Sequence, residues 1–176
     1  LLAGVTLVAG CLLYGAIFLS LKTSGELRDK AAALSGKLWP VVLILLLALM
    51  VSTYYATDIL SWLGVNPGAV RIAGLAAILL AGYFLRTGRQ GWAFIMVAIT
   101  IATTIITAFM LMFPRVMISS LNPDWSLTIY NASSTPYTLK IMTIIAVIFV
   151  PIVLIYQSWT YWTFRKRVSV DSELEY

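Results

Sequence analysis

Residues 141–164 have the sequence IMTIIAVIFVPIVLIYQSWTYWTF, which contains no Asp, Glu, Lys or Arg. About 20 consecutive apolar residues are enough for a helix to cross the hydrocarbon core of a bilayer. A spanning segment of this kind is helical, because its backbone groups find no water to bond within the lipid. The run therefore predicts a transmembrane α-helix, and it has counterparts elsewhere in the chain.

Including this run, five stretches lack any charged residue and are long or apolar enough to consider as spans: 1–21, 38–57, 72–85, 91–114 and 141–164. Four are long enough to span; the short third run extends back past Arg71, whose long side chain can reach the interface. We therefore expect an all-α membrane protein with five transmembrane helices. The expected spans are about 1–21, 38–60, 69–85, 91–113 and 138–164, which together form one transmembrane domain over 1–164, followed by a tail at 165–176.

The composition of the chain excludes an ordinary soluble domain. Of the 176 residues, 61% are hydrophobic and 11% are charged, whereas a soluble domain is about half apolar and a quarter charged. The chain has no His, which argues against imidazole haem ligation, most zinc sites and His-based catalysis. Its single Cys11 cannot form an internal disulfide. Because the sequence opens at Leu1 inside an apolar run, we expect a processed or truncated chain.

The basic residues predict how the helices are oriented. With five spans, three of these residues lie on one side: Arg71, Arg115 and Lys140. The other nine lie on the opposite side: Lys22, Arg28, Lys30, Lys37, Arg86, Arg89, Arg165, Lys166 and Arg167. Such an excess is typical of a cytoplasmic face, and we expect the carboxyl terminus to be cytoplasmic. Trp39, Trp92, Trp159 and Trp162 fall near the expected inner helix ends, where indole rings favour the headgroup zone.

The connections between spans contain the remaining polar residues. In the 22–37 connection we expect a short helix over 25–33, with Glu26 and Lys30 spaced for an i,i+4 pair. Residues 61–68 form a turn by composition. The long outer segment 115–140 is expected to pack on its own helices or on a partner, and the tail 168–176 is expected to be disordered.

The chain offers few residues for catalysis. It has no phosphate-binding glycine loop, no nucleophile elbow and no paired carboxylates. Asp58 is assigned an interfacial or capping role rather than a proton relay, and Arg71 is either an anchor or its partner. Pro151 removes one backbone hydrogen bond from the last span and can kink it. No span shows a continuous polar face, which argues against a channel.

Two motifs make the sequence specific. The first is GAIFLSLKTSGELR at 15–28; the second begins with FPRVM at 113–117 and continues with SLTIYNASS at 126–134, TLKIM at 138–142 and VPI at 150–152. Together they resemble the second half of subunit II of the bacterial cytochrome bd-type quinol oxidases. The resemblance covers most of the chain.

The resemblance implies a fold of a four-helix bundle plus one peripheral helix, and a role in the respiratory chain. Subunit II of this family is a non-haem, multi-pass subunit of the bacterial cell membrane that supports subunit I, where haem b, haem d and the quinol site are expected. No catalytic, cofactor-binding or metal-binding residue is expected in this chain. A bound structural quinone or lipid, and a small accessory subunit, are left open.

We interpret the motif residues as structural. They are Lys22, Thr23, Gly25, Glu26 and Arg28 in the cytoplasmic connection, Ser126, Asn131 and Ser133 in the outer cap, and Pro151 in the last span. Replacing Glu26 or Arg28 by Ala is expected to reduce assembly more than turnover per assembled complex. The alternative interpretation is half of a secondary transporter, which would need a polar cluster around a helix break.

Overall fold

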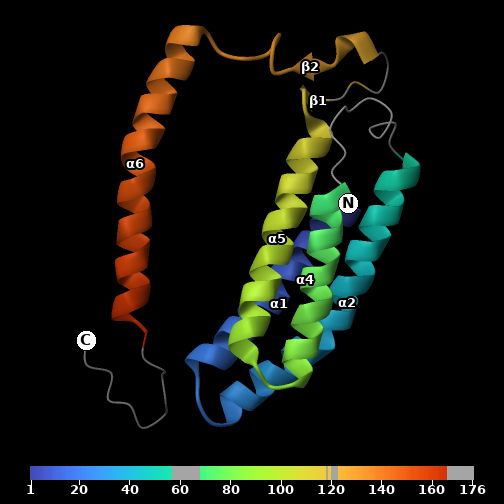
Figure 1. Cartoon of the computed structure of the whole chain (residues 1–176), viewed down its shortest axis with the longest axis vertical. Helices are drawn as coiled ribbons and strands as arrows, with labels where there is room; N and C mark the ends of the chain where they lie inside the picture. The colour runs from blue at the N-terminus through green and yellow to red at the C-terminus, as the bar shows by residue number, and fades with distance from the viewer. Residues whose placement is uncertain (57–67, 118, 120–122, 166–176) are drawn as a thin grey trace. The chain divides into compact units, whose positions relative to one another are not determined.

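The computed structural model describes residues 1–56, 68–117, 119 and 123–165. Asp58, the turn proposed for 61–68 (apart from Gly68) and the tail 168–176 lie outside this part of the chain. The described residues contain helices that are long and apolar enough to cross a membrane, which confirms the prediction of an all-α membrane protein (Figure 1). They are α1 (Leu2–Lys22), α2 (Glu26–Ala56), α4 (Gly68–Arg86), α5 (Gln90–Met112) and α6 (Pro136–Thr163).

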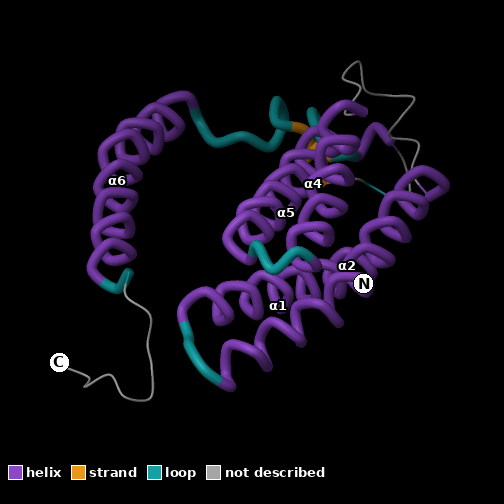
Figure 2. Tube along the Cα trace, turned by 60° about the horizontal axis from the view of Figure 1, so that its bottom comes forward, coloured by secondary structure: helices purple, strands orange, loops and turns teal. Residues whose placement is uncertain are grey.

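The chain divides into two compact units, and the first holds α1, α2, α4 and α5. These four helices run side by side as a bundle (Figures 1 and 2). All four supply residues to one buried cluster: Leu13, Ile17, Val42, Ile78, Ala81, Ala93 and Val97. Tyr14 of α1 stacks on Phe94 of α5 with 4.3 Å between the ring centroids. The first unit is therefore held by a core that every helix shares.

The second helix is longer than the sequence predicted. We expected a short helix over 25–33 and a separate span from residue 38, whereas α2 is one helix of 31 residues with Pro40 inside it. A proline ring crowds the carbonyl of the residue four positions earlier, which here is Gly36. The helix nevertheless continues through Pro40 to Ala56. The connection from α1 to α2 is reduced to residues 23–25.

A similarly short turn joins α4 to α5. Gly88 has a φ of +72°, the left-handed conformation that glycine adopts without a steric penalty. The amide of Arg89 donates to the carbonyl of Phe84 at 2.9 Å, and the amide of Gly88 donates to Leu85 at 3.3 Å. This pattern is a Schellman motif, which satisfies carbonyls at the end of α4 and reverses the chain within a few residues.

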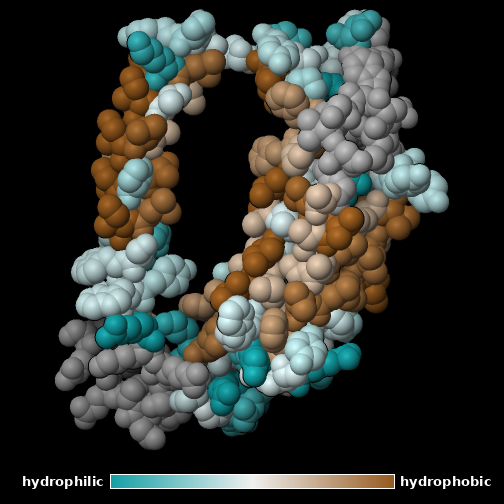
Figure 3. All heavy atoms as spheres, viewed as in Figure 1, coloured by the Kyte–Doolittle hydropathy of each residue, from teal (hydrophilic) through white to brown (hydrophobic). Residues whose placement is uncertain are grey.

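The second unit contains the outer segment and α6. A short antiparallel pair joins β1 (Arg115–Met117) to β2 (Leu127–Thr128), and a 3₁₀ turn, η1 (Pro123–Trp125), lies between them in sequence. The following helix begins at Pro136, with Thr135 as its N-cap, and continues through Pro151 to Thr163. Figure 3 shows apolar residues along most of α6 and polar residues near its ends, as a spanning helix requires.

Candidate functional site

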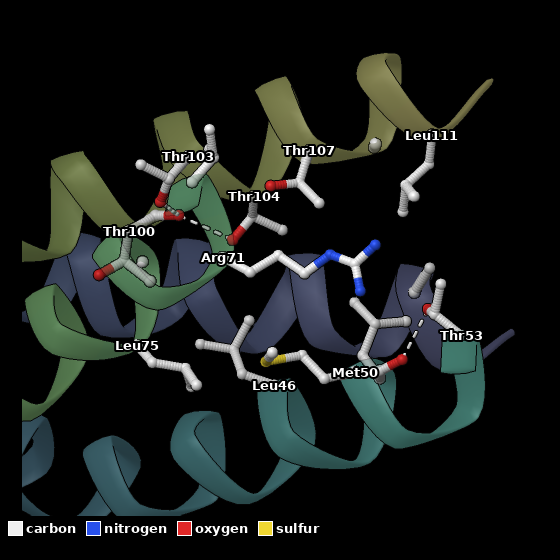
Figure 4. Close-up of a pocket in the computed structure, with 15 residues that line it drawn as sticks. Leu46, Met50, Thr53, Arg71, Leu75, Thr100, Thr103, Thr104, Thr107 and Leu111 are labelled. Carbon is white, nitrogen blue, oxygen red and sulfur yellow. Dashed lines mark hydrogen bonds between the residues drawn. The ribbon is translucent and has the colours of Figure 1, made fainter. Parts of the chain in front are cut away.

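A cavity of about 250 Å³ opens between α2, α4 and α5 at the end of the bundle where α4 begins. Figure 4 shows Arg71 of α4 crossing this space, with α5 on one side and α2 on the other. The walls are mainly aliphatic and include Leu46, Leu49, Met50, Val70, Leu75 and Leu111. The cavity therefore combines one cationic side chain with an otherwise apolar or weakly polar lining.

One face of α5 contributes a row of threonines to this cavity. Thr100, Thr103, Thr104 and Thr107 all line it. Their i, i+3, i+4, i+7 spacing places them on one side of a helix. This row was not among the residues proposed from the sequence, although the spacing of the four threonines would have revealed it.

The hydroxyls of this row are mostly bonded within α5 itself. Thr100 donates to the carbonyl of Met96 at 2.9 Å, Thr103 to Ile99 at 2.8 Å and Thr104 to Thr100 at 2.7 Å. A threonine bonded in this way has its donor occupied and leaves its methyl group free to contact a ligand. The row is consequently less polar than its composition suggests, and it does not form a hydrophilic pore wall.

Arg71 is the unusual residue of the cavity. Its Nε and Nη2 atoms are buried and have no hydrogen-bond partner within the described residues. A buried guanidinium is costly unless an anion and hydrogen bonds compensate it. Asp58, one of the two roles for Arg71 being to pair with it, lies outside the described part of the chain.

A second hollow of about 210 Å³ adjoins the first. Both are lined by Leu46, Leu49, Thr100, Thr104 and Ala108, together with Ala3 of α1. The second hollow continues deeper into the bundle, where Val42, Ile78 and Val97 line it. Because the two hollows share lining residues, they adjoin each other along a line from Arg71 toward the buried core.

The first sequence motif lies at the other end of the bundle. The amide and hydroxyl of Thr23 both donate to the carbonyl of Leu19, at 3.0 and 2.7 Å, and thereby close the last turn of α1. Gly25 has a φ of +69°. Lys30 and Glu26 form the predicted pair, with 2.7 Å between Nζ and Oε1, and both side chains are largely exposed. Lys22 lies in the last turn of α1, so the motif shapes a compact turn.

Arg28 extends this motif toward the turn between α4 and α5. It lines a hollow of about 360 Å³ together with Ser20, Leu21, Gly88, Arg89, Gln90, Gly91 and Trp92. The Oε1 atom of Gln90 is buried there without a partner in the described chain. The structure thus brings two turns that are far apart in sequence to one end of the bundle.

The outer motif closes a small loop in the second unit. Asn131 Oδ1 accepts a hydrogen bond from the amide of Thr128 at 2.6 Å, and its Nδ2 donates to the carbonyl of Ser126 at 3.4 Å. Ser126 is buried, and its hydroxyl accepts from the amide of Ser119 at 3.3 Å. Ser133 is exposed just beyond this loop. Pro151 lies within α6 and takes no part in it.

Few side chains of the His and Cys types occur in this chain. The sequence has no His, and Cys11 is exposed on α1. Across the described ranges, no three residues of the His, Cys, Asp or Glu type gather at one place.

Comparison with known proteins decides the family. Residues 1–164 match the sequence pattern of the family described as "cytochrome bd terminal oxidase subunit II". This chain belongs to that family. It is 36% identical over 176 residues to cytochrome bd ubiquinol oxidase subunit 2 of Bacillus subtilis, an alignment that covers 100% of this chain and 52% of the relative.

Two further relatives agree with this family. The chain is 35% identical over 201 residues to cytochrome bd-I ubiquinol oxidase subunit 2 of Escherichia coli K12, covering 97% of this chain and 53% of the relative. It is 33% identical over 190 residues to a probable cytochrome oxidase subunit 2 of Haemophilus influenzae, covering 92% and 50%. The chain thus spans about half the length of these bd oxidase subunits. The transporter interpretation receives no support.

Proposed function

We propose that this chain is part of subunit II of a cytochrome bd-type quinol:oxygen oxidoreductase. The observation that carries the proposal is the family match over residues 1–164, which includes the five helices of the described residues that are long and apolar enough to span a membrane. In such a complex, electrons pass from quinol to oxygen through haem b and haem d. We assign these haems to subunit I, as the family resemblance implies, and the lack of His in this chain supports that assignment.

The role of this chain is then to support subunit I by helix packing. Helices associate in lipid through close van der Waals contact and interhelical hydrogen bonds, since lipid is as apolar as their side chains. The bundle shows both features, in the shared core and in the hydrogen bond from Trp39 Nε1 of α2 to the carbonyl of Ile78 of α4 at 2.8 Å. A rigid bundle of this kind can hold the fold of a partner without supplying a catalytic residue.

The orientation proposed from the basic residues fits the positions of the turns. The α1–α2 and α4–α5 turns lie at one end of the bundle. In these turns or in the adjoining helix ends are the basic residues Lys22, Arg28, Lys30 and Arg89. A cytoplasmic location for this end accounts for its positive charge. The protein is a multi-pass membrane protein, and we place it in the bacterial cell membrane with its carboxyl terminus in the cytoplasm.

The proposed function is tested by removing the gene for the full-length subunit from a strain without other terminal oxidases. Quinol-dependent oxygen uptake by the membranes should then disappear, and the gene supplied in trans should restore it. Unchanged uptake after removal would contradict the proposal. A small accessory subunit, if the complex has one, would co-purify with the restored protein in a fixed ratio.

A further inference from the structure

We propose that the cavity at Arg71 binds one anionic membrane phospholipid, with the phosphate on the guanidinium and an acyl chain along the adjoining hollows. The inference is independent of oxygen reduction, because it concerns what fills a cavity in this bundle rather than the reaction of the complex. It rests on the charge of the site, the polarity of its walls and the position of Arg71 along the helices.

The charge of the site requires an anion. Arg71 lies in the first turn of α4, and its Nε and Nη2 are buried without a partner in the described residues. The positive end of a helix dipole is also located at a helix N-terminus, where it disfavours a cation and favours an anion. A phosphate would compensate both, and the planar guanidinium can bind two phosphate oxygens in parallel.

The walls of the site favour an apolar chain beside that anion. The cavity of about 250 Å³ is lined mostly by aliphatic side chains, and its threonines Thr100, Thr103 and Thr104 have their hydroxyls bonded to their own helix. The adjoining hollow of about 210 Å³ is lined by apolar residues except for three threonines, Thr6, Thr100 and Thr104. Both volumes greatly exceed the roughly 30 Å³ share of one water molecule, and apolar cavities of this size are poorly suited to water.

The positions of Arg71 and of the second hollow along the helices match the headgroup and the acyl chain of a phospholipid. Arg71 lies near the start of α4, and Figure 4 shows its guanidinium directed toward Thr53 and Leu111, which are close to the ends of α2 and α5. That level corresponds to the headgroup zone of a spanning bundle. The second hollow reaches Val42 and Ile78, which belong to the buried core. Free phosphate could bind Arg71, but it would not fill this apolar hollow.

The test measures bound lipid in the purified full-length complex. Wild-type, Arg71→Gln and Arg71→Lys complexes are washed with the same mild detergent, and the retained phospholipids are extracted and quantified by mass spectrometry. Arg86→Gln is the matched control, because it removes the same charge from the opposite, exposed end of α4. Arg71→Gln should lose about one anionic phospholipid per complex, and Arg86→Gln should retain it. Arg71→Lys should retain only part of it, because lysine keeps the charge but lacks the two parallel hydrogen bonds of the guanidinium. Equal retention in all four complexes would overturn the proposal.

A second measurement covers the case in which Arg71→Gln fails to assemble. The wild-type complex is depleted of lipid, and its thermal midpoint is followed on addition of phosphatidylglycerol, phosphatidylcholine or inorganic phosphate. A ligand that binds the native state raises the midpoint. Phosphatidylglycerol should raise it most, and inorganic phosphate should leave it unchanged. An equal rise with phosphate, or no rise with any addition, would contradict a lipid site.

A third variant tests whether the charge of Arg71 is compensated by a lipid phosphate or by a carboxylate of the same chain. Asp58→Asn should retain the anionic phospholipid, since the proposal gives the phosphate, rather than this carboxylate, the role of compensating Arg71. Loss of the lipid in Asp58→Asn to the same extent as in Arg71→Gln would show that the two side chains form one internal pair, and it would overturn the proposal.

Discussion

The indole ring of Trp39 on α2 occupies the space that a Cβ atom on Gly82 of α4 would need, with the indole atoms Cε2 and Cζ2 as its nearest neighbours. The same indole donates its Nε1 hydrogen to the carbonyl of Ile78, one turn earlier on α4. The guanidinium of Arg86, one turn later, lies 5.7 Å from the ring centroid. Three consecutive turns of α4 therefore face one tryptophan, and Gly82 is the position that allows the close approach.

Replacing Gly82 by Ala should destabilise the bundle, because the added methyl group meets an indole that is already fixed by a hydrogen bond. Overpacking of this kind costs about 1–3 kcal/mol. The measurement is the thermal midpoint of the purified complex. Gly36→Ala is the control, since a Cβ at Gly36 meets no atom of the described chain within 4 Å. Equal midpoints for the two variants would contradict the close contact.

The contact between these residues can also be measured as a coupling. Trp39→Phe removes the hydrogen bond to Ile78 and should cost about 1 kcal/mol. Because the smaller ring leaves room for a methyl group, Gly82→Ala should be less damaging in the Trp39→Phe background than in the wild type. A double-mutant cycle on the thermal unfolding of the complex tests this. Strictly additive effects would show that the residues act independently.

At the α1–α2 turn, backbone conformation should matter more than the ion pair. Gly25 has a φ of +69°, where a side chain is strained, so Gly25→Ala should cost about 1 kcal/mol. Glu26→Ala removes an exposed i,i+4 pair and should cost a few tenths of a kcal/mol. Any larger loss of assembled, haem-containing complex in Glu26→Ala would then arise at a contact with a partner. The yield and thermal midpoint of the complex distinguish the two effects.

In the outer loop, Asn131 should protect the backbone amide of Thr128 from hydrogen exchange. Its Oδ1 accepts from the amide of Thr128, so Asn131→Ala leaves that amide without its side-chain acceptor. Hydrogen exchange of the peptide that contains Thr128 should accelerate. Ser133→Ala, at an exposed position just beyond this loop, should leave the exchange unchanged. Identical exchange in both variants would count against the role assigned to Asn131.

The proposed orientation predicts which turns are accessible from outside the cell. In a Cys11→Ser background, a membrane-impermeant thiol reagent applied to intact cells should label Ser134→Cys and spare Thr87→Cys. Both positions are exposed in the structure. In broken cells the reagent should label both variants. The reverse pattern in intact cells would place the α4–α5 turn outside and contradict the positive-inside assignment.

The helices were predictable because lipid imposes a minimum length of apolar sequence, and five stretches of this chain meet it with modest extension. The boundaries were less predictable. Residues 26–37 are polar enough to suggest a loop, yet they continue α2 outside the apolar stretch, since a helix that leaves the lipid can extend into water. The i,i+4 pair of Glu26 and Lys30 was predicted correctly from spacing alone.

The cavity was not predicted, because it depends on three helices that meet only in the folded bundle. The sequence placed Arg71 near a helix end, but its environment required the positions of α2 and α5. Likewise, Trp39 was expected near a membrane interface, while its bond to Ile78 depends on the register of α2 against α4. In this bundle, hydropathy predicts which segments span, and close packing determines which of their side chains meet.

The central claim is that this chain serves a bd-type oxidase without ligating a haem. The most direct test is to purify the tagged full-length subunit from native membranes and record a reduced-minus-oxidised absorbance spectrum of the eluate. Haem b and haem d bands should appear together with a haem-bearing partner subunit, and the subunit expressed without that partner should show neither band. A colourless eluate without a partner, from well-aerated and oxygen-poor cells alike, would contradict the account.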